Sequence, residues 1–142
     1  MTSEYLRVAA AVPQVAPANV AANQEAVAAI LARATAEGAR VVVLPELCLT
    51  GYTCADLFYQ PSLLDAAESA LAELLPQCGD GLVAIGLPVR VSGRIYNCAA
   101  IVAAGRLRQM TPFEDGTPRS FGSIAFAWRS ARAKLLKNPS QT

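Results

Sequence analysis

The feature that most constrains the fold is the apolar run at residues 41–44 (VVVL), which stops at Pro45 and is followed by Glu46. Continuous runs rich in β-branched residues are typical of strands that are buried on both faces of a parallel sheet. In open α/β sheets, ligands bind beyond the carboxyl ends of such strands. The sequence therefore predicts a parallel strand that presents the Glu46 carboxylate at a binding site.

Length and composition set the class of protein. The 142 residues, 54% of them hydrophobic, suffice for one domain with a buried core. No apolar segment approaches the ~18–20 uninterrupted residues that a membrane span requires, and the N-terminus has no basic region followed by an apolar stretch. We therefore expect a cytoplasmic protein that does not contact a membrane.

Histidine is absent, and the chain has four cysteines: Cys48, Cys54, Cys78 and Cys98. Without histidine, no Ser-His-Asp or Cys-His arrangement forms within the chain, and the commonest zinc ligand is missing. The spacings between the cysteines match no zinc or redox pattern. We expect four buried thiols in a reducing compartment, and no metal site.

Strand and helix patterns alternate along the first 112 residues. The predicted strands are 7–12, 40–44, 82–89, 95–103 and 106–110. One helix is expected from a cap at Asn19 or Asn23 to Gly38, and a second from a cap at Ser62 to Leu75. The long loop between them, 45–61, has room for a helical turn at 54–59. This order predicts an α/β fold in which a βαβ unit precedes antiparallel hairpins.

The C-terminal segment has a different character. Residues 1–105 hold five Lys and Arg against nine Asp and Glu, a net charge of −4, whereas residues 106–142 hold seven against two, a net charge of +5. Periodicity collapses beyond Pro112, although residues 123–136 fit an amphipathic helix. A basic tail can bind nucleic acid, but this one contains no recognised motif. We expect a solvated tail, irregular or helical, and no nucleic-acid partner.

The residues around Glu46 resemble a family signature. The run 44–52 (LPELCLTGY) is similar to the sequence around the first catalytic Glu of the nitrilase, or carbon–nitrogen hydrolase, superfamily. The segments 56–65, 86–88 (GLP) and 94–97 (RIYN) resemble the N-terminal glutaminase domain of the glutamine-dependent NAD synthetase family. The resemblance covers residues 5–110 or thereabouts.

That resemblance implies an α-β-β-α sandwich of which this chain supplies the first half, a mixed sheet with helices on one face. It implies that a Cys thiolate attacks the amide of glutamine, with a Glu as general base and a Lys stabilising the tetrahedral intermediate. By position, Glu46 matches the base and Tyr52 matches a tyrosine of the glutamine pocket. The ammonia passes to a separate synthetase domain, to which ATP and Mg²⁺ would belong. We expect no cofactor in this chain.

The chain departs from the family pattern at the position where the catalytic Lys is expected. Pro112 is followed by Phe113-Glu114-Asp115, no Lys precedes Lys134, and no Cys lies in a nucleophile elbow. These departures predict a partial nitrilase-like domain at 1–112 and an unrelated basic tail at 113–142. They favour a frameshifted, fused or prematurely ended gene whose product is inactive alone.

Two residue roles and one alternative function remain open. Tyr52 either lines the pocket or packs in the core, and Asn97 is expected to be structural, its amide satisfying nearby loop backbone. The alternative to a glutaminase is a non-catalytic nitrilase-like module that binds a partner or forms homo-oligomers. Half of such a sandwich leaves apolar faces exposed to water, and a partner is needed to cover them.

Overall fold

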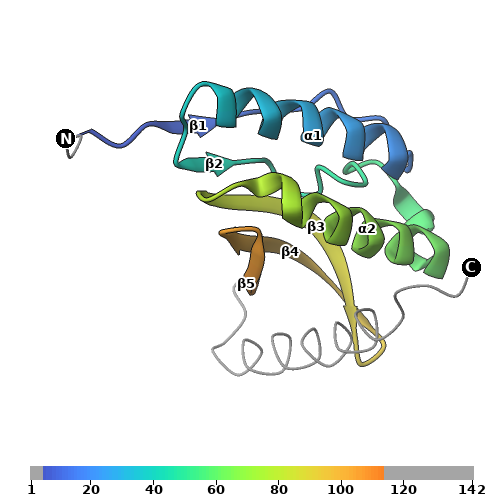
Figure 1. The fold of residues 1–142 in the computed structure, drawn as a ribbon. Coiled ribbons are helices and arrows are strands. Elements are labelled where there is room, and N and C mark those ends of the chain that lie inside the picture. The colour runs from blue at the N-terminus through green and yellow to red at the C-terminus, as the bar shows by residue number, and fades with distance from the viewer. Residues whose placement is uncertain (1–4, 114–142) are drawn as a thin grey trace, which may run out of the picture.

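The computed structural model of this protein describes residues 5–113. Within this range a five-stranded mixed sheet carries two α-helices on one face (Figure 1). The strands follow the order β1 (Val8–Ala10), β2 (Val41–Val43), β3 (Leu82–Val91), β4 (Arg94–Ala103) and β5 (Arg106–Pro112). The first three run parallel, and β3, β4 and β5 are antiparallel neighbours. The predicted α/β fold, with a mixed sheet and helices on one face, is confirmed.

Helix α1 (Val20–Ala36) begins and ends as its sequence predicts. Asn19 is the N-cap, because its side-chain oxygen accepts a hydrogen bond from the Ala22 amide at 3.2 Å. Gly38, just past the last turn, adopts a φ of +74°, a conformation that favours glycine. Asn23, the other candidate cap, instead lies buried on the inner side of the helix.

Helix α2 (Pro61–Leu74) begins one residue before the predicted cap, so the prediction for Ser62 is wrong. The N-cap position is held by Gln60, which makes no side-chain capping bond. Pro61 fits the first helical position because its fixed φ suits a helix and it has no N–H to satisfy. The helix buries Leu63, Leu64, Ala67, Ala70, Leu71 and Leu74. Two short 3₁₀ helices flank it, η1 (Ala55–Tyr59) and η2 (Leu75–Cys78).

Two tight turns fix the register of the antiparallel strands. Ser92 and Gly93, with φ of +49° and +76°, join β3 to β4, and Ala104 and Gly105, with φ of +50° and +64°, join β4 to β5. Positive φ at both central residues is the signature of two-residue hairpin turns whose twist matches that of the strands. The first turn pairs Val91 with Arg94, and this pairing decides which side chains share a face.

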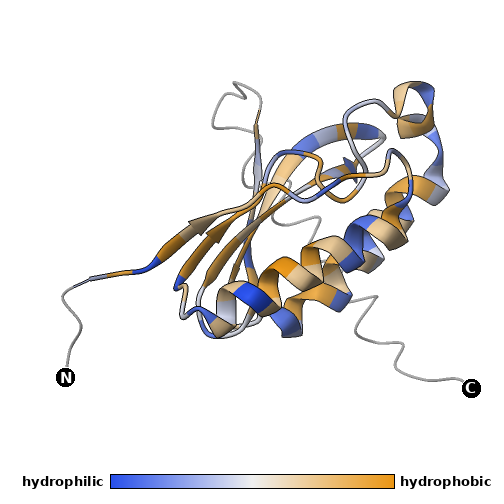
Figure 2. Cartoon of the chain, turned by 90° about the horizontal axis from the view of Figure 1, so that it is seen from above, coloured by the Kyte–Doolittle hydropathy of each residue, from blue (hydrophilic) through white to orange (hydrophobic). Residues whose placement is uncertain are grey.

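Apolar residues dominate the strands, and the two helices cover only one face of the sheet (Figure 2). The inner face packs against α1 and α2, and its buried residues are Val42, Val83, Ile85, Leu87, Val89, Cys98, Ala100, Val102 and Met110. Nine apolar residues among the alternate positions form what we call the outer face: Val8, Ala10, Val41, Val43, Leu82, Ala84, Ala99, Ile101 and Ala103. None of these nine is fully buried. Other alternate positions are polar, among them Arg90, Asn97 and Gln109.

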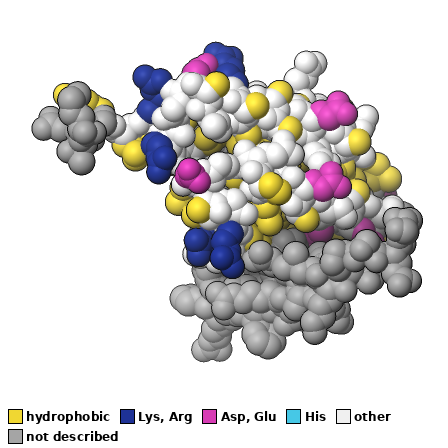
Figure 3. All heavy atoms as spheres, viewed as in Figure 1, with side chains coloured by type: hydrophobic (Ala, Val, Ile, Leu, Met, Phe, Trp, Pro, Cys, Tyr) yellow, Lys and Arg dark blue, Asp and Glu magenta, His cyan; other side chains and the backbone are white. Residues whose placement is uncertain are grey.

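No helix within residues 5–113 is both long enough and apolar enough to cross a membrane. On the face drawn in Figure 3, basic side chains gather toward the end from which the N-terminus leaves, and acidic ones are spread separately. Of the basic tail predicted at 113–142, all but Phe113 lies outside the described residues, including Lys134 and Lys137.

Candidate functional site

The loop after β2 carries Glu46 across the outer side of β3. It can do so because Gly86 has no side chain: a Cβ built there would lie 2.3 Å from the Pro45 carbonyl oxygen and 2.7 Å from the Glu46 Cα. The Leu49 amide then donates to the Gly86 carbonyl at 3.3 Å. Glycine is therefore required at this position for the loop to cross the strand.

A sharp turn follows Glu46 directly. Leu47 adopts a φ of +49°, and its carbonyl accepts hydrogen bonds from the amides of Thr50 and Gly51. A non-glycine residue in this conformation stores backbone strain, which folded proteins retain where the surrounding structure enforces it. Here the enforced turn aims the neighbouring Glu46 side chain away from the core.

Asn23 of α1 anchors the same loop from the helical layer. Its fully buried side chain accepts from the Ala16 amide at 2.7 Å and donates to the carbonyls of Ala16 and Leu49 at 2.9 and 3.1 Å. The sequence suggested only a cap for Asn23. A signal was present, since Asn23 lies between Val20 and Val27 on the buried stripe of the helix, where a polar residue needs partners.

Two neighbours hold the Glu46 carboxylate through a single oxygen. The Tyr52 hydroxyl donates to Oε2, and the Asn97 side-chain Nδ2 donates to the same atom at 2.9 Å. These bonds, first from Tyr52 and then from Asn97, lower the pKa of Glu46 below its ordinary value. The same contact raises the pKa of Tyr52. Glu46 is thus a carboxylate at neutral pH, and within residues 5–113 no hydrogen bond reaches its Oε1.

Asn97 has a different partner from the one expected. The predicted bond from its amide to loop backbone is wrong, because the Nδ2 donates to Glu46. Its Oδ1 is buried and accepts no hydrogen bond from the described part of the chain. Asn97 pairs with Pro88 two positions beyond Gly86, so the register of β3 and β4 brings it beside the loop. This pairing is set by the hairpin turn and was not visible from the neighbours of Asn97 in sequence.

A cavity of about 640 Å³ lies beside Leu47 and Asn97, the neighbours of Glu46, although Glu46 itself does not line it. Phe58 and Tyr59 of η1 form part of its wall, and Arg94, Tyr96 and Asn97 of β4 form another part. The lining is mainly apolar and aromatic, with one cationic side chain near the hairpin turn. The residues that line it do not include Tyr52, whose side chain is 62% exposed. A place for Tyr52 in a glutamine pocket stays a prediction, while its hydroxyl contact with Glu46 is observed.

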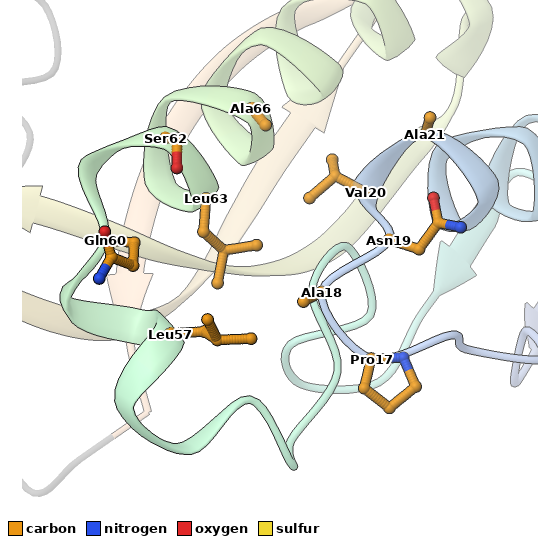
Figure 4. Close-up of a pocket in the computed structure, with 10 residues that line it drawn as sticks. All are labelled: Pro17, Ala18, Asn19, Val20, Ala21, Leu57, Gln60, Ser62, Leu63 and Ala66. Atoms are coloured by element: carbon orange, nitrogen blue, oxygen red, sulfur yellow. The ribbon is translucent and has the colours of Figure 1, made fainter.

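A second cavity, of about 470 Å³, lies between the first turns of α1 and α2. Figure 4 shows Leu57 and Leu63 on one side of it and Pro17 and Val20 on the other. No ionisable side chain lines this cavity. It is therefore unsuited to proton transfer, and the Glu46 cluster remains the candidate catalytic region.

The cysteines near Glu46 are poor nucleophiles. All four are free and buried, as predicted, and the thiols of Cys48 and Cys54 donate to backbone carbonyls. Burial raises the pKa of Cys48 to about 11 and that of Cys98 to about 12. The thiolate needed for attack is therefore scarce at neutral pH. Over residues 5–113, no three His, Cys, Asp or Glu side chains gather as a metal site would require.

Comparison with known proteins identifies the family. Residues 7–120 match the sequence profile described as carbon-nitrogen hydrolase. This chain belongs to the carbon-nitrogen hydrolase family. The match confirms the resemblance carried by residues 44–52, and it places the described sheet and helices within that family's fold. The predicted domain boundary at residue 112 stays a prediction.

Members of the carbon-nitrogen hydrolase family named glutamine-dependent NAD(+) synthetase are similar to this chain. The protein of Mycobacterium tuberculosis (strain H37Rv) is 36% identical over 110 residues, covering 76% of this chain and 16% of its own length. That of Xylella fastidiosa (strain Temecula1) is 36% identical over 109 residues, covering 75% of this chain and 20% of its own. This chain thus spans a fifth or less of these relatives.

Solved structures of the carbon-nitrogen hydrolase family share the fold. A glutamine-dependent NAD(+) synthetase from Cytophaga hutchinsonii superposes with a TM-score of 0.72 at 30% identity, over 74% of this chain and 18% of that one. An amidase from Nesterenkonia sp. superposes with a TM-score of 0.66 at 20% identity, over 88% of this chain and 48% of that one. The similarity to the synthetase supports the predicted glutaminase-type domain, and the amidase supports the fold.

Proposed function

We propose that this chain carries the general base of a glutamine amidohydrolase site of the kind that supplies ammonia for NAD synthesis. The observation that supports this most directly is the Glu46 carboxylate, ionised and held through Oε2 by Tyr52 and Asn97. The similarity to glutamine-dependent NAD(+) synthetases over 76% of the chain supports glutamine as the substrate.

The role of Glu46 follows from the way it is held. Hydrogen bonds fix Oε2, so Oε1 is the oxygen that accepts a proton from an incoming nucleophile and later returns it to the leaving ammonia. The two donors also keep the carboxylate from rotating. Tyr52 and Asn97 are therefore positioning residues, while Glu46 is the residue that transfers the proton.

The cavity beside Asn97 suits glutamine in its chemistry. Phe58 and Tyr96 offer apolar surface to the methylene groups, and the Arg94 guanidinium offers a charge partner for the α-carboxylate. The nucleophile and the lysine are not among residues 5–113, because the described cysteines are buried and no Lys precedes Lys134. Groups from outside this range have to complete the reaction.

We assign the protein to the cytoplasm and assign ATP and Mg²⁺ to a separate synthetase domain. The four free buried thiols support a reducing compartment.

The test has a catalytic and a binding part. The purified full chain is expected to release no ammonia from glutamine above background, because its described thiols are buried and burial raises the pKa of Cys48 and Cys98. Measurable turnover that disappears in Glu46→Ala would contradict this expectation while supporting Glu46 as the base.

Binding is followed by ¹H–¹⁵N NMR during titration with glutamine. We expect millimolar affinity and shifts at the Asn97 side-chain amide, with weaker binding in Arg94→Gln and unchanged binding in the matched control Arg108→Gln. Arg108 is exposed on β5 and does not line the cavity. If glutamine caused no shifts near Asn97, or the two variants behaved alike, the proposed pocket would be wrong.

The second candidate function, a non-catalytic module that associates through an apolar surface, is favoured by one observation. The outer face of the sheet is made of apolar side chains that the described residues leave partly exposed. A stable homo-oligomer without glutamine binding would support this alternative.

A further inference from the structure

Asn23 is a polar residue in a position that apolar side chains normally occupy. It lies on the buried stripe of α1, and within residues 5–113 it and Thr50 are the polar residues that are completely buried. Asparagine also favours a helix interior less than alanine or leucine does. Burial of its amide costs free energy unless hydrogen bonds replace those with water. The place of Asn23 in the core therefore depends on the bonds that it makes.

Those bonds join two loops to the helix. Asn23 exchanges two hydrogen bonds with the backbone of Ala16, in the loop before α1, and donates a third to the carbonyl of Leu49, in the loop after β2. The two loops also contact each other directly, because the Ala18 amide donates to the Thr50 carbonyl at 2.8 Å. Asn23 thus fixes the point at which both loops meet the helical layer.

Leu49 is held from both layers of the fold. Its carbonyl accepts a hydrogen bond from Asn23 of α1, and its amide donates to the Gly86 carbonyl of β3 at 3.3 Å. Leu49 lies three residues after Glu46, within the turn that the carbonyl of Leu47 closes. The position of Glu46 above the sheet therefore depends on the bond from the helix as well as on the bond to the strand.

We propose that Asn23 is a positioning residue for the Glu46 carboxylate. Its side chain makes no hydrogen bond to the carboxylate, but through Leu49 it sets the distance of the loop from β4. It thereby keeps Oε2 of Glu46 within reach of the Asn97 amide, 2.9 Å away. A displacement of ~1 Å is enough to break such a bond. The inference rests on the proposed function in taking Glu46 as the base, but its test measures the carboxylate directly and needs no turnover.

The position requires an amide side chain. The three bonds need one acceptor and two N–H donors on a short planar group, which asparagine provides. Aspartate lacks both donors and would bury a charge. An apolar residue would continue the buried stripe of α1 but leave the carbonyls of Ala16 and Leu49 without this donor. Substitution of Asn23 should therefore release the loop while the helix remains.

The test is the titration of Glu46 in the full chain, followed by carboxyl ¹³C NMR. In Asn23→Ala we expect the loop to move and the carboxylate to lose hydrogen bonds. This loss raises the pKa of Glu46 and lowers its acid dissociation constant roughly threefold or more. Leu31→Ala is the matched control, because Leu31 is 2% exposed on the same stripe. It lies ~12 Å further along α1, so its truncation weakens the core without releasing the loop, and the titration should match that of wild type.

Circular dichroism checks that each variant is folded, and Asn23→Ser is the second variant if Asn23→Ala is not. Wild type offers a further measurement, because coupling between two sites is reciprocal. The ¹H–¹⁵N signals of the Asn23 side chain should shift as Glu46 titrates, and this step should vanish in Glu46→Gln.

Three results would overturn the proposal. They are an unchanged Glu46 titration in a folded Asn23 variant, an equal shift in Leu31→Ala, and Asn23 signals in wild type that do not respond to Glu46. Each would mean that Asn23 contributes to stability alone. Failure of the proposed function would look different, since glutamine would then cause no shifts near Asn97 while the Glu46 titration still responded to Asn23.

Discussion

The two faces of the sheet are built from similar residues yet serve different purposes. On the inner face, Ile85 and Leu87 are completely buried against the helices. On the outer face, Leu82 and Ala84 of the same strand stay partly exposed, and the loop that carries Glu46 crosses the strand at Gly86. Hydrophobicity alone does not distinguish the faces. The difference lies in what covers each one.

Within this single sheet, one face stabilises the fold and the other carries the candidate catalytic group. The inner face supplies the buried apolar surface that stabilises the fold. On the side of the sheet away from the helices, Asn97 of β4 meets the Glu46 carboxylate. Substitutions on the inner face should therefore change the free energy of unfolding, and those on the outer face should change association and the titration of Glu46.

The largest effect on the free energy of unfolding is expected when two isoleucines on neighbouring strands are truncated and compared. Ile85→Ala removes a fully buried inner-face side chain and should lower the free energy of unfolding by about 3–4 kcal/mol. Ile101→Ala, the same substitution on the outer face, should cost about 1 kcal/mol because its side chain is already partly in water. Urea denaturation monitored by circular dichroism, at a concentration where the chain is monomeric, measures both values.

Equal losses of unfolding free energy in the two variants would contradict the proposed difference between the two faces. They would mean that the outer face is as well packed as the inner one. Repeating the measurement at high protein concentration sharpens the test. There, a dimer through the outer face would raise the cost of Ile101→Ala relative to its value in the monomer.

A smaller effect is expected where the functional loop meets the sheet. Gly86→Ala would place a methyl group 2.3 Å from the Pro45 carbonyl oxygen, so the loop has to move. We expect a loss of about 1–3 kcal/mol in the free energy of unfolding. Displacement of the loop should also break the Asn97–Glu46 hydrogen bond and raise the pKa of Glu46.

Ala103→Val is the control for Gly86→Ala, because it adds bulk to the same face away from the loop. It should leave the Glu46 titration unchanged. A Gly86→Ala protein with an unaltered pKa at Glu46 would show that the loop is not held by its close approach to β3.

Local sequence predicted the inner face better than the site. The run 41–44 and the other apolar stretches indicated strands because strand propensity is a local property. Glu46 was indicated by its place after the strand at 41–44 and Tyr52 by a family signature, and the structure brings the two side chains into contact. Their roles in catalysis stay predictions.

The contact between Asn97 and Glu46 could not be predicted in the same way. It joins residues 51 positions apart and depends on the β3–β4 register together with the crossing of the loop at Gly86. The start of α2 was misplaced for a different reason. Ser62 is a favourable cap, but Pro61 already supplies helical geometry one residue earlier.

The finest test separates the two donors to Glu46. Tyr52→Phe and Asn97→Ala should each raise the pKa of Glu46, and Tyr52→Phe should raise it more because the tyrosine bond is the larger cause of the lowered value. Carboxyl ¹³C NMR titration measures the shift. Tyr59→Phe is the control, because Tyr59 does not contact the carboxylate.

The pH dependence of stability follows from the same shift. Because folding lowers the pKa of Glu46, the stabilisation from its two bonds is present above the unfolded value of about 4.3 and is lost as the pH falls through the folded value. Wild type and Tyr52→Phe should therefore differ most in unfolding free energy near neutral pH and converge in acid. A difference that persisted unchanged at pH 2 would mean that Tyr52 stabilises the fold through packing and not through its bond to Glu46. The Glu46 carboxylate would then be ordered by its hydrogen bond from Asn97 alone.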